Sequence, residues 1–131
     1  MQTLRPSTEL EASVDILAAA RANEAFRRVI HTGVHEQVVV MTIPPDGEIG
    51  AEVHPGTDQL FIVVAGTAEA QVGTATIRAT PNDLVFVEAG TPHNVVNRGE
   101  SPLRLITVYA PPAHAPGTVH LTRAEAEAAE R

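Results

Sequence analysis

Short runs of apolar and β-branched residues, each bounded by turn residues, follow one another through most of the chain. Runs of this composition and length are typical of β-strands, and Gly, Pro, Asn and Asp between them are typical of turns. The segments predicted as strands are 26–31, 36–43, 60–64, 68–72, 75–79, 84–87, 93–97 and 103–109. Many short strands with regular turn signals predict an all-β sandwich or barrel.

Helical character is confined to the two ends of the chain. Residues 13–23 contain Ser13 as a candidate N-cap and a run of alanines, and one face of the predicted helix carries Ile16, Leu17 and Ala20. Residues 121–131 are rich in Ala and Glu, and Thr122 and Glu125 have the spacing of a capping box. We therefore predict one short helix before the strands and one after them.

The length of 131 residues fits one domain with one core, and 44% hydrophobic against 19% charged residues is an ordinary globular composition. The prolines after the last long strand predict an end to the sheet, because proline cannot donate to a strand ladder. We expect a helical arm at 1–25, a β-barrel at 26–112 and a proline-containing tail with the terminal helix at 113–131.

Composition excludes several kinds of function. A formal charge of −7 disfavours nucleic acid and anionic lipid as partners. Cysteine is absent, which excludes thiolate catalysis and thiolate metal sites. All nine basic residues are arginine, so Schiff-base catalysis and the lysine of a phosphate-binding loop are also excluded. No apolar run reaches about 18 residues and the first residues do not resemble a signal peptide, so we expect no membrane contact and a cytoplasmic protein.

Four residues form a candidate metal site. Glu52 and His54 are two positions apart in extended sequence, so their side chains point to the same side. Gln59 follows across a short turn, and His93 follows a Gly90-Thr-Pro turn. Imidazole and oxygen donors together suit a first-row divalent metal better than calcium. The alternative is that Gln59 only bonds a neighbouring strand and Glu52 is an exposed strand residue.

The spacing of these residues resembles that of the cupin superfamily, small β-barrel proteins with two motifs that meet at a metal site. The first motif corresponds to 46–66, with Glu52 and His54 in its two histidine positions and Gln59 in its glutamate position. The second corresponds to 82–97, and it matches at Gly90, His93 and Asn97. The resemblance implies a single double-stranded β-helix, or jelly roll, and zinc, manganese, iron or nickel as the metal.

The ligand types narrow the resemblance. One Gln, one Glu and two His are also the zinc ligands of type I phosphomannose isomerases, with Gln and Glu in opposite positions. The chain is therefore similar to the small mannose-6-phosphate-isomerase-like cupins, although it has no lysine and no obvious phosphate cradle. Small cupins that linearise uronate sugars have a similar ligand set. Both analogies point to a small polar, sugar-like substrate.

The predicted pocket has several other candidate residues. Strand parity selects Phe61, Val63, Phe86 and Val95 as its apolar walls, with plain core packing as the alternative. Candidates for a general acid or base are Glu88, Tyr109, His35 and His120. His114 and His120 lie in the tail, which either covers the mouth of the barrel or is exposed. Arg27 and Arg28 are adjacent on a strand, so only one of them can enter the cavity and bind an anion.

Three functions stay open. The first is a metal-dependent isomerase, lyase or hydratase that uses the metal as a Lewis acid, with oxygen activation at iron as a variant. The second is a non-catalytic binding or sensor protein, and the third is a cupin that has lost its metal. The resemblance also implies a homodimer that pairs through edge strands. Residues 36–41 are apolar enough to be such an edge, or equally a central strand.

Overall fold

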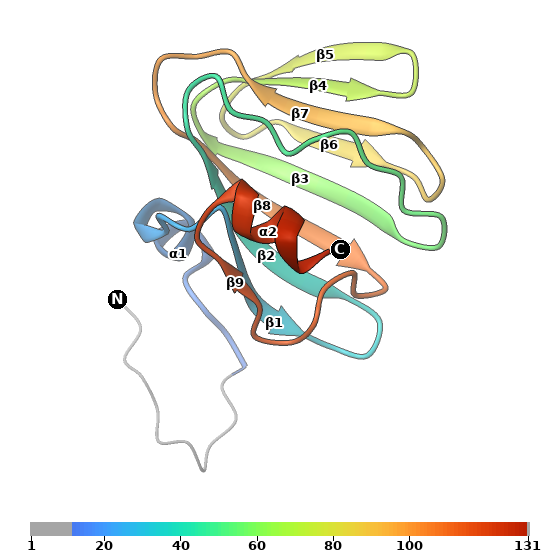
Figure 1. The fold of residues 1–131 in the computed structure, drawn as a ribbon. Coiled ribbons are helices and arrows are strands. Elements are labelled where there is room, and N and C mark those ends of the chain that lie inside the picture. Colours follow the sequence, from blue (N-terminus) through green and yellow to red (C-terminus); the bar gives the residue numbers. More distant parts are fainter. Residues whose placement is uncertain (1–11, 131) are drawn as a thin grey trace.

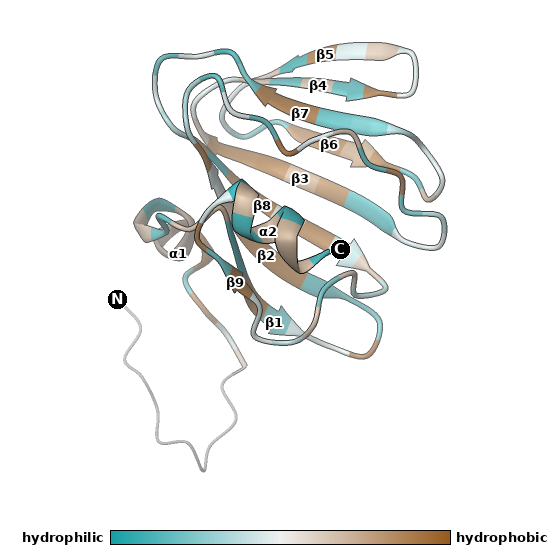
Figure 2. Ribbon diagram, viewed as in Figure 1, coloured by the Kyte–Doolittle hydropathy of each residue, from teal (hydrophilic) through white to brown (hydrophobic). Residues whose placement is uncertain are grey.

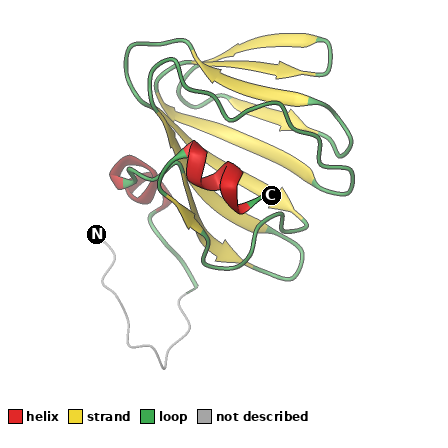
Figure 3. Cartoon of the chain, in the orientation of Figure 1, coloured by secondary structure: helices red, strands yellow, loops and turns green. Residues whose placement is uncertain are grey.

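The computed structural model describes residues 12–130, which form two antiparallel sheets and two short helices (Figures 1 and 3). In chain order the elements are α1 (Ile16–Ala22), β1 (Arg27–Thr32), β2 (Gln37–Ile43), β3 (Asp58–Ala65), β4 (Ala68–Val72), β5 (Ala75–Ala79), β6 (Leu84–Val87), β7 (His93–Asn97), β8 (Leu103–Ala110), β9 (Val119–His120) and α2 (Arg123–Ala129). One sheet has the order β6-β3-β8-β2-β1-β9, and the other has the order β5-β4-β7. The predicted all-β class with a helix at each end is confirmed.

The long loop at 44–57 completes the smaller sheet. Glu48 pairs with Val96 and Glu52 pairs with His93, each as an isolated antiparallel bridge to β7. The loop starts at a turn in which Asp46 has a φ of 65°, a conformation that Asp tolerates better than most residues. In Figure 1 this loop runs beside β7 before the chain enters β3. A segment without a regular strand thus brings the first motif to the second.

The core lies between the two sheets. Phe86, one of the residues predicted to face it, faces outward instead. Phe61, Val63 and Val95 are buried in this core, as predicted from strand parity. Phe86 is 66% exposed, and its neighbours on β6, Val85 and Val87, are buried instead. The register explains the error, because Phe61 lies opposite Val85, and directly opposed residues share a face. Figure 2 shows the mainly apolar colouring of β3 and β8, two neighbouring inner strands of the larger sheet.

The first helix covers the outer face of the larger sheet. Ala20 packs there against Val40 and Ile106, in a cluster separate from the main core. The N-cap is Asp15, whose Oδ1 accepts a hydrogen bond of 3.0 Å from the N–H of Ala18. The predicted cap at Ser13 is therefore wrong, because the helix begins only at Ile16. Leu17 is exposed and does not share the buried face.

The second helix lies on the opposite side of the larger sheet (Figure 1). Its Ala126 is buried in the main core, so the helix packs on its own barrel. Thr122 is the N-cap and accepts from the N–H of Glu125 at 3.1 Å, while Glu125 Oε2 accepts from the N–H of Leu121 at 2.6 Å. The predicted capping pair is confirmed, with the Glu side chain reaching one residue further back. Arg131 of the predicted helix lies outside the described residues.

The strand considered as a possible sheet edge lies inside the larger sheet. The segment 36–41 falls in β2, which lies between β8 and β1, so it is a central strand and the edge interpretation is wrong. The edges of the larger sheet are β6 and β9. Among residues 12–130, no helix has the length and apolar character needed to span a bilayer.

Candidate metal centre

Two elements distant in sequence place the candidate ligands side by side. Glu52 and His54 lie in the 44–57 loop, and His93 is the first residue of β7. The N–H of Glu52 donates to the carbonyl of His93 at 2.9 Å, and the N–H of His93 donates to the carbonyl of Glu52 at 3.0 Å. This pair of backbone bonds holds the two side chains on one face.

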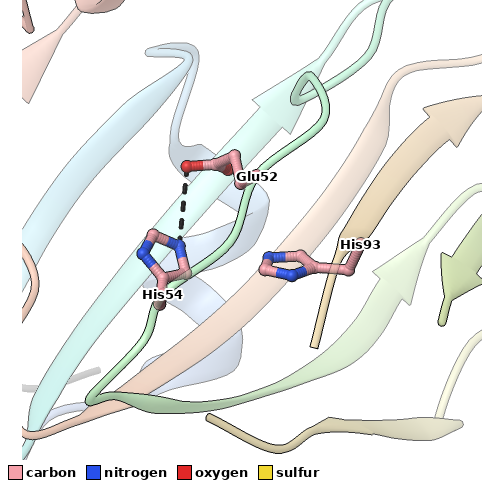
Figure 4. Close-up of side chains that lie close together, drawn as sticks. All are labelled: Glu52, His54 and His93. Carbon is pink, nitrogen blue, oxygen red and sulfur yellow. Dashed lines mark ion pairs between the residues drawn. The ribbon is translucent and has the colours of Figure 1, made fainter. Parts of the chain in front are cut away.

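The side chains of Glu52, His54 and His93 lie close together (Figure 4). Their ligand atoms all lie within 4.8 Å of one another. The Nε2 of His54 is 3.5 Å from Oε2 of Glu52, and the centroids of the two imidazole rings are 5.4 Å apart. Two atoms that ligate one ion at about 2.0–2.2 Å lie at most about 4.4 Å apart. Small side-chain rotations therefore bring all three groups to a single ion.

Three buried polar atoms in this region have no hydrogen-bond partner among the described residues. They are Nε2 of His54, Nε2 of His93 and Oε1 of Gln59. Buried polar atoms in folded proteins are almost always paired, because an unpaired one costs about 1–3 kcal/mol. The two imidazole nitrogens belong to the cluster, and Gln59 lies on β3 opposite Tyr109, whose ring is edge-on to that of His54. Glu52, His54 and His93 thus fit a divalent metal on geometry and on donor chemistry, and Gln59 fits on donor chemistry.

Hydrogen bonds with neighbouring groups orient two of the candidate ligands, His93 and Gln59. His93 Nδ1 lies 2.9 Å from the carbonyl oxygen of Thr91, so Nδ1 carries the proton and Nε2 presents its lone pair. The amide nitrogen of Gln59 donates to Oγ1 of Thr107 on β8 at 3.1 Å, which leaves Oε1 free. Gln59 therefore bonds a neighbouring strand with one end of its amide and keeps the other end available.

Burial shifts the pKa values of two residues of the cluster. Burial raises the pKa of the Glu52 carboxyl, against the lowering effects of the Arg27 guanidinium and of His93. Burial also lowers the pKa of His54, and the nearby His93 and Arg27 lower it further. A neutral His54 imidazole is the form that binds a metal, and a cation at this point would favour the ionised form of Glu52.

A series of edge-on ring contacts extends from the cluster into the tail. The ring of Tyr109 is edge-on to His54, with centroids 5.9 Å apart, and edge-on to His114, with centroids 5.0 Å apart. Tyr109 is fully buried, and burial raises its pKa to about 12, so its hydroxyl keeps its proton at neutral pH. The sequence candidate Tyr109 therefore lies beside the cluster, in contact with His54.

His114 was not selected as a site residue from the sequence. The side chain of buried Gln37 holds it in place, donating to the His114 carbonyl at 2.7 Å and accepting from the His114 N–H at 3.0 Å. Its Nε2 is buried with no hydrogen-bond partner in the described part of the chain, and burial lowers the pKa of His114 to about 3. The only sequence signal was its place in the proline-containing tail, because the contact with Gln37 joins distant parts of the chain.

The remaining sequence candidates are spread over the molecule. Glu88 is exposed in the turn after β6, and His35 is exposed in the turn between β1 and β2. His120 is half-buried, and its Nδ1 lies 3.3 Å from Nη1 of Arg27. Arg27 is buried whereas Arg28 donates to Asn23, so only one of the two arginines faces the interior, as expected.

Comparison with known proteins agrees with this geometry. A family model described as a cupin domain matches residues 39–109, which include all four candidate ligands. The chain is 39% identical over 123 residues to YrkC of Bacillus subtilis (strain 168), covering 89% of this chain and 66% of YrkC. The crystal structure of BH2720 from Bacillus halodurans superposes with a TM-score of 0.89 at 37% identity, covering 95% of this chain and 99% of that one.

A weaker similarity extends to larger proteins. The chain is 31% identical over 113 residues to a mannose-1-phosphate guanylyltransferase of Salmonella muenchen. The match covers 78% of this chain and 24% of that protein, so the chain spans about a quarter of the length of this relative.

Proposed function

The chain belongs to the cupin family, and on this premise we propose that it binds one divalent transition metal through Glu52, His54, Gln59 and His93. The observation that carries the proposal is the set of buried atoms without a hydrogen-bond partner among residues 12–130, two imidazole nitrogens and one amide oxygen, together with the half-buried carboxylate of Glu52. Two nitrogen and two oxygen donors suit zinc, manganese, iron or nickel, whereas calcium prefers oxygen donors alone.

We further propose that the bound metal serves an isomerase, lyase or hydratase reaction on a small oxygenated molecule. A metal with this ligand set supplies Lewis-acid polarisation of a carbonyl or hydroxyl oxygen. One carboxylate among four ligands neutralises only half of a divalent charge, which preserves that polarising power. The similarity to a mannose-1-phosphate guanylyltransferase and the ligand types support a sugar-like substrate, although the chain has no lysine for a phosphate group.

The protein's own side chains would shape the site around the ion. Tyr109, Phe61 and Val63 are buried around the interior, and they limit the access of water. The hydroxyl of Tyr109 keeps its proton at neutral pH, so it is suited to donate a hydrogen bond rather than to act as a base. The unpartnered Nε2 of His114 offers a hydrogen-bonding position on the tail side of the Tyr109 ring.

Oxygen activation is a second candidate reaction. The converging cluster consists of two imidazoles and one carboxylate, which are the donors of the facial triad in non-haem iron oxygenases. Gln59 would then be an additional weak ligand. The identity of the metal separates this candidate from the Lewis-acid reactions.

A substrate panel tests the proposal of catalysis. Protein loaded separately with zinc, manganese, nickel or iron is incubated with small hydroxycarbonyl compounds, aldoses, ketoses and uronates, and the products are analysed by NMR. We expect turnover of at least one class and its loss in the His54→Ala variant. Binding without turnover would instead identify a non-catalytic binding protein, and equal turnover by His54→Ala would contradict a metal-dependent reaction.

A further inference from the structure

An incompletely paired guanidinium is buried near the candidate metal centre. Arg27 is the first residue of β1, and its side chain is only 3% exposed. Its Nε is buried without a hydrogen-bond partner among residues 12–130. Its Nη1 lies 3.3 Å from Nδ1 of His120 and 3.6 Å from Oε1 of Glu130. A buried guanidinium is stable only when acceptors surround it, so this side chain has capacity for a further anion.

Arg27 and the metal ligand Glu52 open onto the same pocket. The pocket has a volume of about 120 Å³, and helix α2 forms its other wall through Arg123, Ala126, Glu127 and Glu130. Because one water occupies about 30 Å³ of liquid, this space holds roughly four waters or one small organic acid. A molecule bound here would lie between the guanidinium and the Glu52 side of the metal centre.

The carboxylate of Glu130 lies near Arg27, where another anion would bind. Glu130 is the C-cap residue of α2, its side chain is 57% exposed, and its carboxylate is 3.6 Å from Arg27, beyond good hydrogen-bond distance. This contact is long and its Glu130 partner is largely solvated, so a better placed carboxylate can displace it. The second guanidinium of the pocket is already engaged, because Arg123 Nη2 lies 2.9 Å from the carboxylate of Glu127.

We propose that Arg27 binds the carboxylate of a small organic acid, and that Glu130 occupies this position when the acid is absent. The planar guanidinium fork matches a carboxylate. Three acidic side chains, Glu52, Glu127 and Glu130, line the pocket, so a phosphate dianion meets more repulsion than a carboxylate does. The part of the inference that places the acid against the metal rests on the proposed function, whereas the contact with Arg27 does not need the ion.

The test is an NMR titration of the full chain with acetate, with glycolate and, separately, with inorganic phosphate. It uses protein as purified and protein treated with chelator, with the metal content of each sample measured. Glu130→Gln removes the internal competitor at an exposed position that does not endanger folding. We expect Glu130→Gln to bind acetate about two- to fivefold more tightly than wild type, because a weakly held internal competitor is lost. Glu127→Gln, on the same helix and the same pocket, is the matched control and should stay within about twofold.

Arg27→Gln should abolish saturable binding, and its amide spectrum shows whether the variant is folded. Unchanged affinity in Glu130→Gln would overturn the proposal, and an equal gain in Glu127→Gln would assign the anion to Arg123 instead. Tighter binding of phosphate than of acetate would overturn the choice of carboxylate. If the protein holds no metal but Glu130→Gln still gains affinity, the proposed function fails and the anion site stands.

Discussion

Gln59 serves the fold and the candidate site with opposite ends of one amide. Its nitrogen donates to Thr107 on the neighbouring strand, and its oxygen is buried without a partner. Motif spacing selects Gln59 from the sequence, but spacing does not reveal which amide atom is left unpaired. The structure supplies that orientation through the hydrogen bond with Thr107.

A pair of substitutions at Gln59 tests its role as a ligand. Gln59→Leu removes the oxygen donor and should weaken zinc binding at least about tenfold, in the range found when supporting groups of metal sites are lost. Gln59→Glu replaces the amide with an anionic donor and should bind zinc at least as tightly as wild type. Competition with a chromophoric chelator measures both affinities. Gln71→Leu, the same change at an exposed position of β4, is the control. Wild-type affinity in Gln59→Leu would remove Gln59 from the site.

At the scale of elements, the buried amide of Gln37 fixes the first part of the tail after β8. Gln37 on β2 bonds the backbone of His114, and the N–H of Ala113 also donates to Gln37 Oε1 at 3.2 Å. Prolines in the sequence indicate that the sheet ends before this tail. They do not indicate where the tail docks, because docking depends on a side chain far away in the sequence.

This docking predicts an acid-sensitive stability. The pKa of His114 is about 3 in the folded chain and about 6.5 in the unfolded chain. Between these values the unfolded state binds a proton that the folded state does not, so the free energy of unfolding falls as the pH falls below about 6.5. From pH 7 to pH 5, His114→Gln should lose less stability than wild type, by on the order of 1 kcal/mol after allowance for partial solvent exposure.

Urea unfolding of chelator-treated protein at the two pH values measures this difference. His35→Gln, at an exposed position in the turn between β1 and β2, is the control and should follow wild type. An identical pH dependence in His114→Gln and wild type would contradict the burial of this imidazole.

At the scale of the whole molecule, the sequence predicts most of the strands but not how their faces meet. The strands β4, β5, β6 and β7 have their predicted bounds because Gly, Pro and Asn turns fix both ends of each. The alternation along β6 predicts that Phe86 points inward, which is wrong. Which side chains of β6 point inward depends on how the strand pairs with β3. The contacts between Arg27 and α2 likewise arise only when the tail returns across the barrel.

The edge strand β6 is the candidate interface of the expected homodimer. β6 is an edge strand of the larger sheet, with Phe86 66% and Leu84 44% exposed. Exposed apolar edges tend to associate, so we expect the dimer to bury this strand. Phe86→Glu should shift the protein toward monomer in sedimentation velocity, whereas Val34→Glu, at a turn position that is 82% exposed, should not. Wild-type protein that sediments as a monomer, or a Phe86→Glu dimer, would contradict this interface.

The central claim is that Glu52, His54, Gln59 and His93 hold one metal ion. Its most direct test is metal content per chain, by plasma mass spectrometry, in protein purified without chelator or histidine tag. We predict close to one zinc, manganese, nickel or iron per chain in wild type, none in a His54→Ala, His93→Ala double variant, and a full complement in a control with the exposed His31 and His35 both changed to alanine. Wild-type protein that stays empty after incubation with each of these ions would contradict the account.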